Sequence, residues 1–281
     1  MPFIVGAARS GTTLLRLMLD SHPHLAIPPE THFIRRAAKA CKRASNPHRA
    51  FLETVTSTHR WEHFGIERDS LVQEIIAIEP FDISEALRSF YALWAKRFGK
   101  PRWGDKTPTY LRRMTFIHNL LPEAHFIHII RDGRDVALSI KDLWFGANSV
   151  DEAAYRWQAD IEKARSQSRE LPHYLEIRYE DLVSDTESTL RNICDFIDIL
   201  WDASMLDYYK TAEERMSETW EHSYSRERRM DEQKKALHSL TREPPQRDRV
   251  SRWRQEMSTT DRQRFEEVAG ETLRGLGYDV G

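Results

Sequence analysis

The sequence of 281 residues predicts one α/β domain in which helices flank a central parallel sheet. Three observations predict this class. Short apolar runs alternate with segments of helical periodicity along the chain, as a parallel sheet requires. The first apolar run leads through a glycine-bracketed loop into a helix-like segment. No internal repeat or low-complexity tract interrupts the alternation.

The N-terminal part of the chain supplies the first strand and two helices. Residues 3–7 form a short apolar run, which is typical of a buried strand. Residues 12–21 follow with leucines and a methionine on one helical face, and Pro23 ends the helix. Between residues 83 and 98, apolar side chains recur at helical spacing, and Gly99 provides the stop.

The rest of the chain continues the alternation. Residues 102–106 read as a short strand that runs into a loop, and strands are expected at 125–130 and 174–179. Helices are expected at residues 108–121, 136–144, 151–169, 185–199 and 258–276. Region 212–249 is polar with weak apolar periodicity, so it is a helical excursion, a mobile lid or a plain solvated segment, and the last is favoured.

Composition excludes several function classes. The net charge of −2 gives no global field for nucleic acid. Cys41 and Cys194 lie far apart, which does not suggest a disulfide framework and favours a reducing compartment. The first strand begins at residue 3, leaving no room for a signal peptide, and no run of about 18 apolar residues could span a membrane. A cytoplasmic protein is therefore expected.

The loop after the first strand has the layout of a phosphate-binding loop. Residues 3–15 read FIVGAARSGTTLL, with Gly6 and Gly11 bracketing four residues. An ATP-binding P-loop carries lysine after the second glycine to reach the β- and γ-phosphates, whereas this chain has Thr12 there. A P-loop-like turn of backbone amides and hydroxyls without that lysine suits an anion that needs no γ-phosphate and no metal.

A second polar segment follows the strand at 125–130. That strand delivers Arg131 to its carboxyl end, where ligands collect in open α/β sheets. Ser139 returns to the same side about two helical turns later. The guanidinium and the hydroxyl could clamp a second phosphate. An ion pair between Arg131 and Asp132 that merely ends the strand is an equally weighted alternative.

Together these segments resemble the sulfotransferases that use 3′-phosphoadenylyl sulfate (PAPS). The residues Arg9, Ser10, Gly11, Thr12 and Thr13 are similar to the family's 5′-phosphosulfate loop. The resemblance makes Arg131 and Ser139 the 3′-phosphate site, and it places Tyr179, in the segment YEDL, near the adenine.

The likeness is strongest to the tyrosylprotein sulfotransferase branch and its bacterial relatives. It rests on RSGTTLLR at 9–16, MLDSHP at 18–23, Glu30-Thr31, GDKTP at 104–108 and LGYD at 276–279, while residues 33–100 contribute little. That branch is lumenal, membrane-anchored and disulfide-bonded, and this chain shows none of those marks. A small metabolite, a lipid or a sugar is therefore as open an acceptor as peptide tyrosine.

The resemblance implies one sulfotransferase domain over residues 1–281, moving a sulfuryl group from PAPS to an acceptor hydroxyl without a metal. Arg9, Lys106 and Ser251 would stabilise charge near the phosphosulfate, and Ser251 is carried over from the short segment 247–254, which stands in for a basic segment of the cytosolic enzymes. Glu30 would be the general base, which needs a raised pKa.

Alternatives remain at this stage. His32 is the rival base, at half the weight of Glu30, and the two would share one face of an extended segment or diverge on a helix. By themselves, Glu30 reads as a helix N-terminal charge and Lys106 as a solvated loop cation. A P-loop kinase-like phosphotransferase and a catalytically silent nucleotide-binding protein are the rival functions. The polar region 212–249 could also cover a neighbouring copy in a homodimer.

Overall fold

The structure is a computed structural model that describes the whole chain except residues 59, 142, 144–145 and 218–241. Its centre is a parallel four-stranded sheet in the order β4-β1-β5-β6. The strands are β1 (Pro2–Val5), β4 (Asp105–Lys106), β5 (His125–Ile130) and β6 (Tyr174–Arg178). A separate parallel pair joins β2 (Leu25–Ala26) to β3 (Arg102–Trp103). The predicted α/β class with a central parallel sheet is confirmed.

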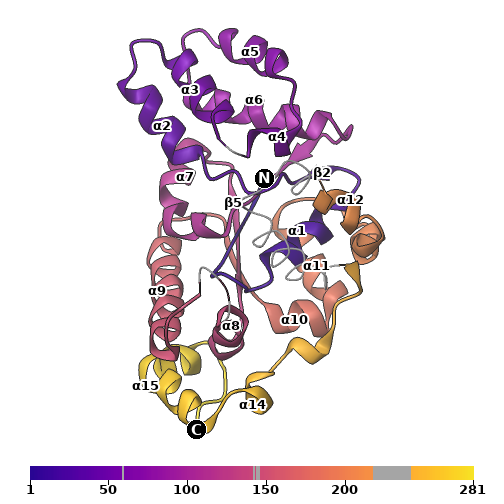
Figure 1. Cartoon of the computed structure of the whole chain (residues 1–281). Coiled ribbons are helices and arrows are strands. Elements are labelled where there is room, and N and C mark those ends of the chain that lie inside the picture. Colours follow the sequence, from indigo (N-terminus) through magenta and orange to yellow (C-terminus); the bar gives the residue numbers. More distant parts are fainter. Residues whose placement is uncertain (59, 142, 144–145, 218–241) are drawn as a thin grey trace.

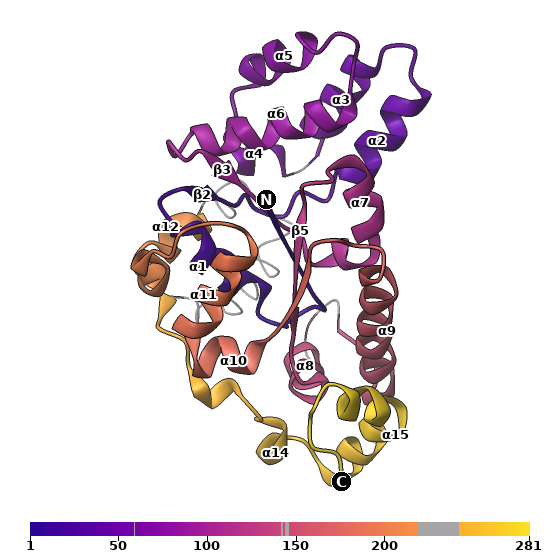
Figure 2. The same ribbon diagram turned by 180° about the vertical axis from the view of Figure 1, so that it is seen from behind.

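Alternate side chains of the central strands enter different hydrophobic clusters, because successive residues of a strand face opposite sides of the sheet. Phe3 and Val5 pack in one cluster with Phe126, whereas Ile4 packs in the other with Ile127. The helices on the Ile4 side are α1 (Thr12–Asp20), α10 (Tyr179–Ser184) and α11 (Thr186–Phe196). Both faces of the sheet are therefore covered by helices (Figures 1 and 2).

The other side of the sheet carries η1 (Pro108–Arg113), α7 (Met114–Leu120), α8 (Gly133–Ile140) and α9 (Val150–Ser168). The C-terminal helix α15 (Thr259–Gly275) packs against α9, where the rings of Trp157 and Phe265 lie 6.0 Å apart. The remaining C-terminal elements are η2 (Ala203–Lys210), α12 (Ala212–Ser217), η4 (Arg247–Arg249) and α14 (Trp253–Glu256).

Residues 34–96 form a helical layer at the end of the molecule opposite α14 and α15 (Figure 1). Its helices are α2 (Ile34–Arg43), α3 (Pro47–Thr56), α4 (Trp61–Phe64), α5 (Arg68–Ile76) and α6 (Ile83–Lys96). Phe33, Phe64 and Phe90 meet edge to face at its centre, with ring centroids 4.8–6.3 Å apart. Of these helices, the sequence predicted only the one from residue 83.

Several predicted boundaries change for local reasons. The strand expected at 102–106 divides at Gly104, whose Cβ would lie 2.7 Å from the carbonyl oxygen of Pro2, so β3 and β4 join different sheets. The helix expected at 136–144 begins earlier, at Gly133, because the Asp132 carboxylate caps it. Region 212–249, for which a solvated segment was favoured over a helical excursion or a lid, lies largely outside the described residues. Among the described helices, none is long and apolar enough to cross a membrane.

The core predicts a large difference between two Leu→Ala substitutions. Leu190 on α11 is fully buried, whereas the Leu200 side chain is exposed. We expect Leu190→Ala to lower the free energy of unfolding by about 3 kcal/mol and Leu200→Ala by less than about 0.5 kcal/mol, since only the first leaves a cavity. Urea denaturation of both variants measures this, and equal losses would contradict the packing described.

Candidate active site

The carboxyl ends of the four parallel strands meet at one edge of the sheet, because all four run in the same direction. The chain passes from β1 to β4 on one side and then crosses to β5 on the other, so β1 is the point where the strand order reverses. Ligands of open α/β sheets bind at such a point. The loop of residues 6–11, Lys106, Arg131 and Tyr179 all stand at this edge.

The loop after β1 is shaped by its two glycines. A Cβ on Gly6 would lie 2.7 Å from the carbonyl oxygen of Ile129. Gly11 has φ of 98°, and a Cβ there would lie 2.5 Å from the Tyr179 ring, so both the backbone angle and the space require glycine. The loop thereby passes close over the ends of β5 and β6.

At the start of α1, several polar groups have no hydrogen-bond partner within the described part of the chain. Gly11 is its N-cap and provides no side-chain cap, so the amides of the first turn, from Thr12 and Thr13 on, are left for another acceptor. The Ser10 hydroxyl is buried, and among the described residues it has no hydrogen-bond partner. A buried orphan hydroxyl beside an uncapped helix N-terminus is the arrangement that an anion would satisfy.

Three arginines from distant segments meet beside this loop. Arg131 donates from Nη1 to the carbonyl of Arg9 at 3.2 Å and from Nη2 to the carbonyl of Arg249 at 2.7 Å. Its guanidinium also lies 4.3 Å from the centre of the Tyr179 ring. Burial, followed by repulsion from Arg131 and Arg249, lowers the pKa of Arg9 to about 10. A bound anion would relieve this repulsion.

Arg131 therefore faces the loop and does not form the alternative ion pair with Asp132. The Asp132 carboxylate instead accepts hydrogen bonds from Arg134, at 3.0 Å from Nε and 2.8 Å from Nη2. The backbone amide of Asp132 donates to Oε1 of Glu180 at 3.0 Å. The Tyr278 hydroxyl donates to Oε2 of Glu180, also at 3.0 Å. The C-terminal segment LGYD thus braces the end of β5 that carries Arg131.

The predicted Ser251 lies in a segment that Asp135 fastens to α8. The buried Asp135 carboxylate accepts the backbone amides of Ser251 and Trp253, both at 2.9 Å. Ser251 has φ of 59°, a left-handed conformation that is uncommon for a residue with a Cβ. Arg9, with φ of 66°, shares this property. Such strained backbone is common at functional sites.

The second part of the site is an ion pair between Glu30 and Lys106. Lys106 Nζ donates to Glu30 Oε1 at 2.8 Å, and His32 Nε2 lies 2.8 Å from Oε2. Lys106 is only 5% exposed, so it is not a solvated loop cation. Burial lowers its pKa, against the opposite effect of Glu30. Because β4 pairs with β1 in the register Ile4↔Lys106, this pair lies beside the loop.

The pKa of Glu30 differs from the expectation. Burial alone would raise it, but the charge of Lys106 and the contact with His32 outweigh burial and hold it well below its usual range. The prediction that the base Glu30 has a raised pKa is therefore wrong for this state. Glu30 and His32 lie neither along an extended face nor on a helix, since His32 adopts φ of 54° and its ring folds back onto Glu30.

Ser139 was predicted for the site, whereas Arg249 and Asp135 were not. Ser139 is half-buried on α8, and no hydrogen bond joins it to Arg131 in the described part of the chain. Sequence reasoning missed Arg249, although it lay inside the segment 247–254 that was singled out. It also missed Asp135, whose position four residues after Arg131 was an available signal.

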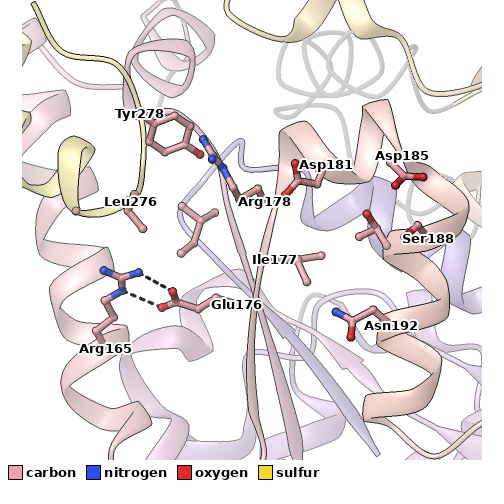
Figure 3. Close-up of a pocket in the computed structure, with 13 residues that line it drawn as sticks. Arg165, Glu176, Ile177, Arg178, Asp181, Asp185, Ser188, Asn192, Leu276 and Tyr278 are labelled. Carbon is pink, nitrogen blue, oxygen red and sulfur yellow. Dashed lines mark hydrogen bonds and ion pairs between the residues drawn. The ribbon is translucent and has the colours of Figure 1, made fainter.

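A cavity of about 630 Å³ lies elsewhere, along the open edge of β6 (Figure 3). Its walls include residues of α9, α11 and the C-terminal segment, and a bidentate pair between Arg165 and Glu176, at 3.0 and 2.7 Å, lines it on the side of α9. None of the predicted site residues lines this cavity. Ile130 and Arg178, the last residues of β5 and β6, also line it, so the cavity reaches the carboxyl ends of these two strands.

The loop after β1, the arginine cluster and the Glu30–Lys106 pair thus lie together at one edge of the parallel sheet. A profile of the sulfotransferase family matches residues 3–203. The chain belongs to the sulfotransferase family.

Named relatives agree with this assignment. The protein-tyrosine sulfotransferase of Drosophila melanogaster is 28% identical over 215 residues, which cover 73% of this chain and 39% of that protein. Protein-tyrosine sulfotransferase A of Caenorhabditis elegans is 29% identical, again over 73% of this chain and 52% of the relative. The chain thus spans about half the length of such relatives or less.

Two solved structures share the fold over the entire chain. The sulfotransferase domain of the Synechococcus PCC 7002 olefin synthase superposes with a TM-score of 0.66 at 22% identity, over 100% of this chain and 95% of that one. The sulfotransferase domain from the curacin biosynthetic pathway superposes with a TM-score of 0.66 at 20% identity, over 100% of this chain and 98% of that one.

The depressed pKa of Glu30 predicts a pH-dependent stability. A carboxylate whose pKa falls on folding stabilises the native state above its ordinary value of 4.5, and this contribution is lost as the pH falls through the lower native value. Glu30→Gln should therefore be clearly less stable than wild type at pH 7, and the difference in unfolding free energy should narrow toward pH 3.

Glu53→Gln is the matched control, because it removes an exposed pair with Arg49 and should cost less than about 0.5 kcal/mol throughout. Denaturant titrations at several pH values measure both differences. A Glu30→Gln difference that stays constant from pH 7 to pH 3 would contradict the pairing.

Proposed function

We propose that this chain is a PAPS-dependent sulfotransferase, which transfers a sulfuryl group to the hydroxyl of an acceptor and releases 3′-phosphoadenosine 5′-phosphate (PAP) and a sulfate ester. The observation that carries the proposal is the placement of two sites at neighbouring strand ends. An arginine-rich loop with the orphan Ser10 hydroxyl follows β1, and the Glu30–Lys106 pair lies at the end of β4. One suits the donor and the other suits proton removal and charge stabilisation.

The residues of the loop fit the donor's 5′ end. Ser10, Gly11, Thr12 and Thr13 would hold its phosphate through the uncapped amides and hydroxyls at the start of α1. On the other side of β1, Arg131 and Ser139 would hold the 3′-phosphate, and Tyr179, already stacked on Arg131, would border the adenine. The unpredicted Arg249, whose positive charge lowers the pKa of Arg9, would add a third guanidinium to the same anion site.

The reaction needs one proton transfer and charge stabilisation on both sides of sulfur. The acceptor oxygen would form a bond to sulfur as its proton passes to Glu30, and the bond from sulfur to the 5′-phosphate oxygen would break with its electron pair left on that oxygen. Arg9, Lys106 and Ser251 would stabilise the resulting charge. No step requires a metal.

The ion pair between Glu30 and Lys106 couples these two tasks. With Lys106 bound at 2.8 Å, the Glu30 carboxylate is a weak base. As negative charge develops on the leaving oxygen, Lys106 would be drawn toward it, and Glu30 would lose its strongest stabilising charge. Its affinity for a proton would then rise at the moment when the acceptor hydroxyl releases one.

The acceptor carries a hydroxyl group, and its class remains a proposal. The relatives are named for protein tyrosine, and a metabolite, lipid or sugar is equally open for a chain that spans about half their length. Both Cys41 and Cys194 are free and buried, which supports a reducing, cytoplasmic compartment. We assign one catalytic domain to residues 1–281.

Glu30→Gln tests the proposed base. We expect at least a 100-fold slower transfer of label from 35S-PAPS into a source-cell extract, because the amide cannot accept the proton, with PAP affinity within about two-fold of wild type. Mass spectrometry of the labelled products identifies the acceptor, and Glu53→Gln serves as the control. Unchanged turnover would eliminate Glu30 as the base, and no transfer by wild type would overturn the proposed function.

Arg131→Ala tests the assignment of the 3′-phosphate site. Loss of the bidentate, charge-assisted hydrogen bonds of Arg131 should weaken the binding of PAP by about 30-fold or more. The binding of adenosine 5′-phosphosulfate, which lacks the 3′-phosphate, should weaken by less than about three-fold. Arg131→Lys keeps the positive charge but not the bidentate fork, so its affinity for PAP should lie between those of wild type and Arg131→Ala. Calorimetric titration measures each affinity, and equal losses for both ligands would refute the assignment.

A further inference from the structure

A buried polar cluster lies directly beneath the Glu30–Lys106 pair. It consists of Thr31, Asp105, Thr107, Tyr91 and Tyr110, each no more than 5% exposed. Its members come from the segment before α2, from β4, from η1 and its N-cap Thr107, and from α6. Buried polar groups are costly unless they are hydrogen-bonded, so a cluster of five in one place calls for a specific role.

Asp105 is the centre of this cluster. Its Oδ2 accepts the hydroxyl of Thr31 at 2.7 Å and that of Tyr91 at 2.8 Å. Tyr110 OH lies 3.0 Å from Thr31 Oγ1, so a hydroxyl on η1 contacts the same threonine. Burial raises the pKa of Asp105, against the opposing effect of its hydroxyl donors. The Thr31 side chain is thereby fixed by three elements of the fold.

The cluster and the catalytic pair occupy opposite sides of the same two segments. Thr31 stands between Glu30 and His32, and Lys106 stands between Asp105 and Thr107. Inward, Thr31 binds Asp105 through its hydroxyl and Thr107 through its backbone amide, at 2.7 and 3.0 Å. Outward, Lys106 meets Glu30 at 2.8 Å. Any shift of Thr31 along β4 would therefore also move Glu30 against Lys106.

Beyond the β2–β3 pairing, side chains rather than backbone groups hold the segment that carries Thr31 against the segment that carries β4. The β2–β3 pairing ends at Ala26 and Trp103, followed by one bond from the Gly104 amide to the Ala26 carbonyl at 3.0 Å. The next residues of the first segment include Pro28 and Pro29, which have no amide hydrogen to donate. Thr31 is where the connection to the β4 segment resumes, through Thr107 and Asp105.

We propose that Thr31 and Asp105 are positioning residues, which set the placement of Glu30 against Lys106 for the transfer step. Neither touches the reacting atoms, and both act through their catalytic neighbours. The inference rests on the proposed function. Misplacement of a catalytic group by about 1 Å can cost about 100-fold in rate, so loss of the Thr31 hydroxyl should reduce the rate of transfer more than donor binding.

Thr31→Val and Thr31→Ser form the test, because valine matches the shape without the hydroxyl and serine keeps the hydroxyl. We expect Thr31→Val to lower kcat for sulfuryl transfer from PAPS by 10- to 100-fold, with PAP affinity within two-fold of wild type. Thr31→Ser should stay within about three-fold in kcat. In a Glu30→Gln background, Thr31→Val should lose most of its effect, because the group it positions no longer acts as a base.

A readout without turnover separates this inference from the proposed function. The part of the stability loss between pH 7 and pH 3 that Glu30→Gln removes reports the Glu30–Lys106 pair. Measured by adding Glu30→Gln to each background, this part should shrink in Thr31→Val but persist in Thr31→Ser. This comparison still tests the positioning role if wild type transfers no sulfuryl group, which would overturn the proposed function alone. If Thr31→Val does not fold, Tyr91→Phe removes the other donor to Asp105 and should lower kcat by three- to ten-fold.

Three results would overturn the inference. Either Thr31→Val retains kcat within two-fold together with the wild-type pH dependence, or Thr31→Val and Thr31→Ser lose activity equally. A Thr31→Val variant that loses PAP affinity as much as kcat would also refute it, since the residue would then act on the fold of the whole site.

Discussion

The parallel pairing of β1 with β4 on one side and β5 on the other is the constraint on which the site depends. It places the loop of residues 6–11 between Lys106 and Arg131, which lie about 25 residues apart in the sequence. The close approach of this loop to the strands requires Gly6 and Gly11, so the backbone amides and the arginines can share one small region. Without this register, the two parts of the site would not adjoin.

The two parts use charge in opposite ways. Around the loop, Arg9, Arg131 and Arg249 gather like charges, and burial together with that repulsion lowers the pKa of Arg9 to about 10. At the end of β4, Glu30 and Lys106 neutralise one another at 2.8 Å. In the proposed function, an anionic donor would complete the first arrangement and compete for the lysine of the second, so that binding at one part would prepare the chemistry of the other.

The sequence predicted the elements whose signals are local. Apolar runs and glycines located β1, β5 and the loop between β1 and α1, and strand direction alone placed Arg131 at the carboxyl edge of the sheet. The helical layer of residues 34–96 escaped prediction except for α6. The low pKa of Glu30 and the fold-back of His32 could not be predicted either, because they depend on Lys106, 76 residues away in sequence, and on a left-handed backbone at a residue with a Cβ.

Titration calorimetry of the chain with PAP and with ATP, each with and without magnesium, tests the central claim most directly. If the loop after β1 and Arg131 hold a nucleotide with phosphates at both the 3′ and 5′ positions, PAP will bind tightly and with the same affinity in the presence and absence of magnesium, and ATP will bind at least 100-fold more weakly. Tight ATP binding that depends on magnesium, with weak PAP binding, would contradict this account.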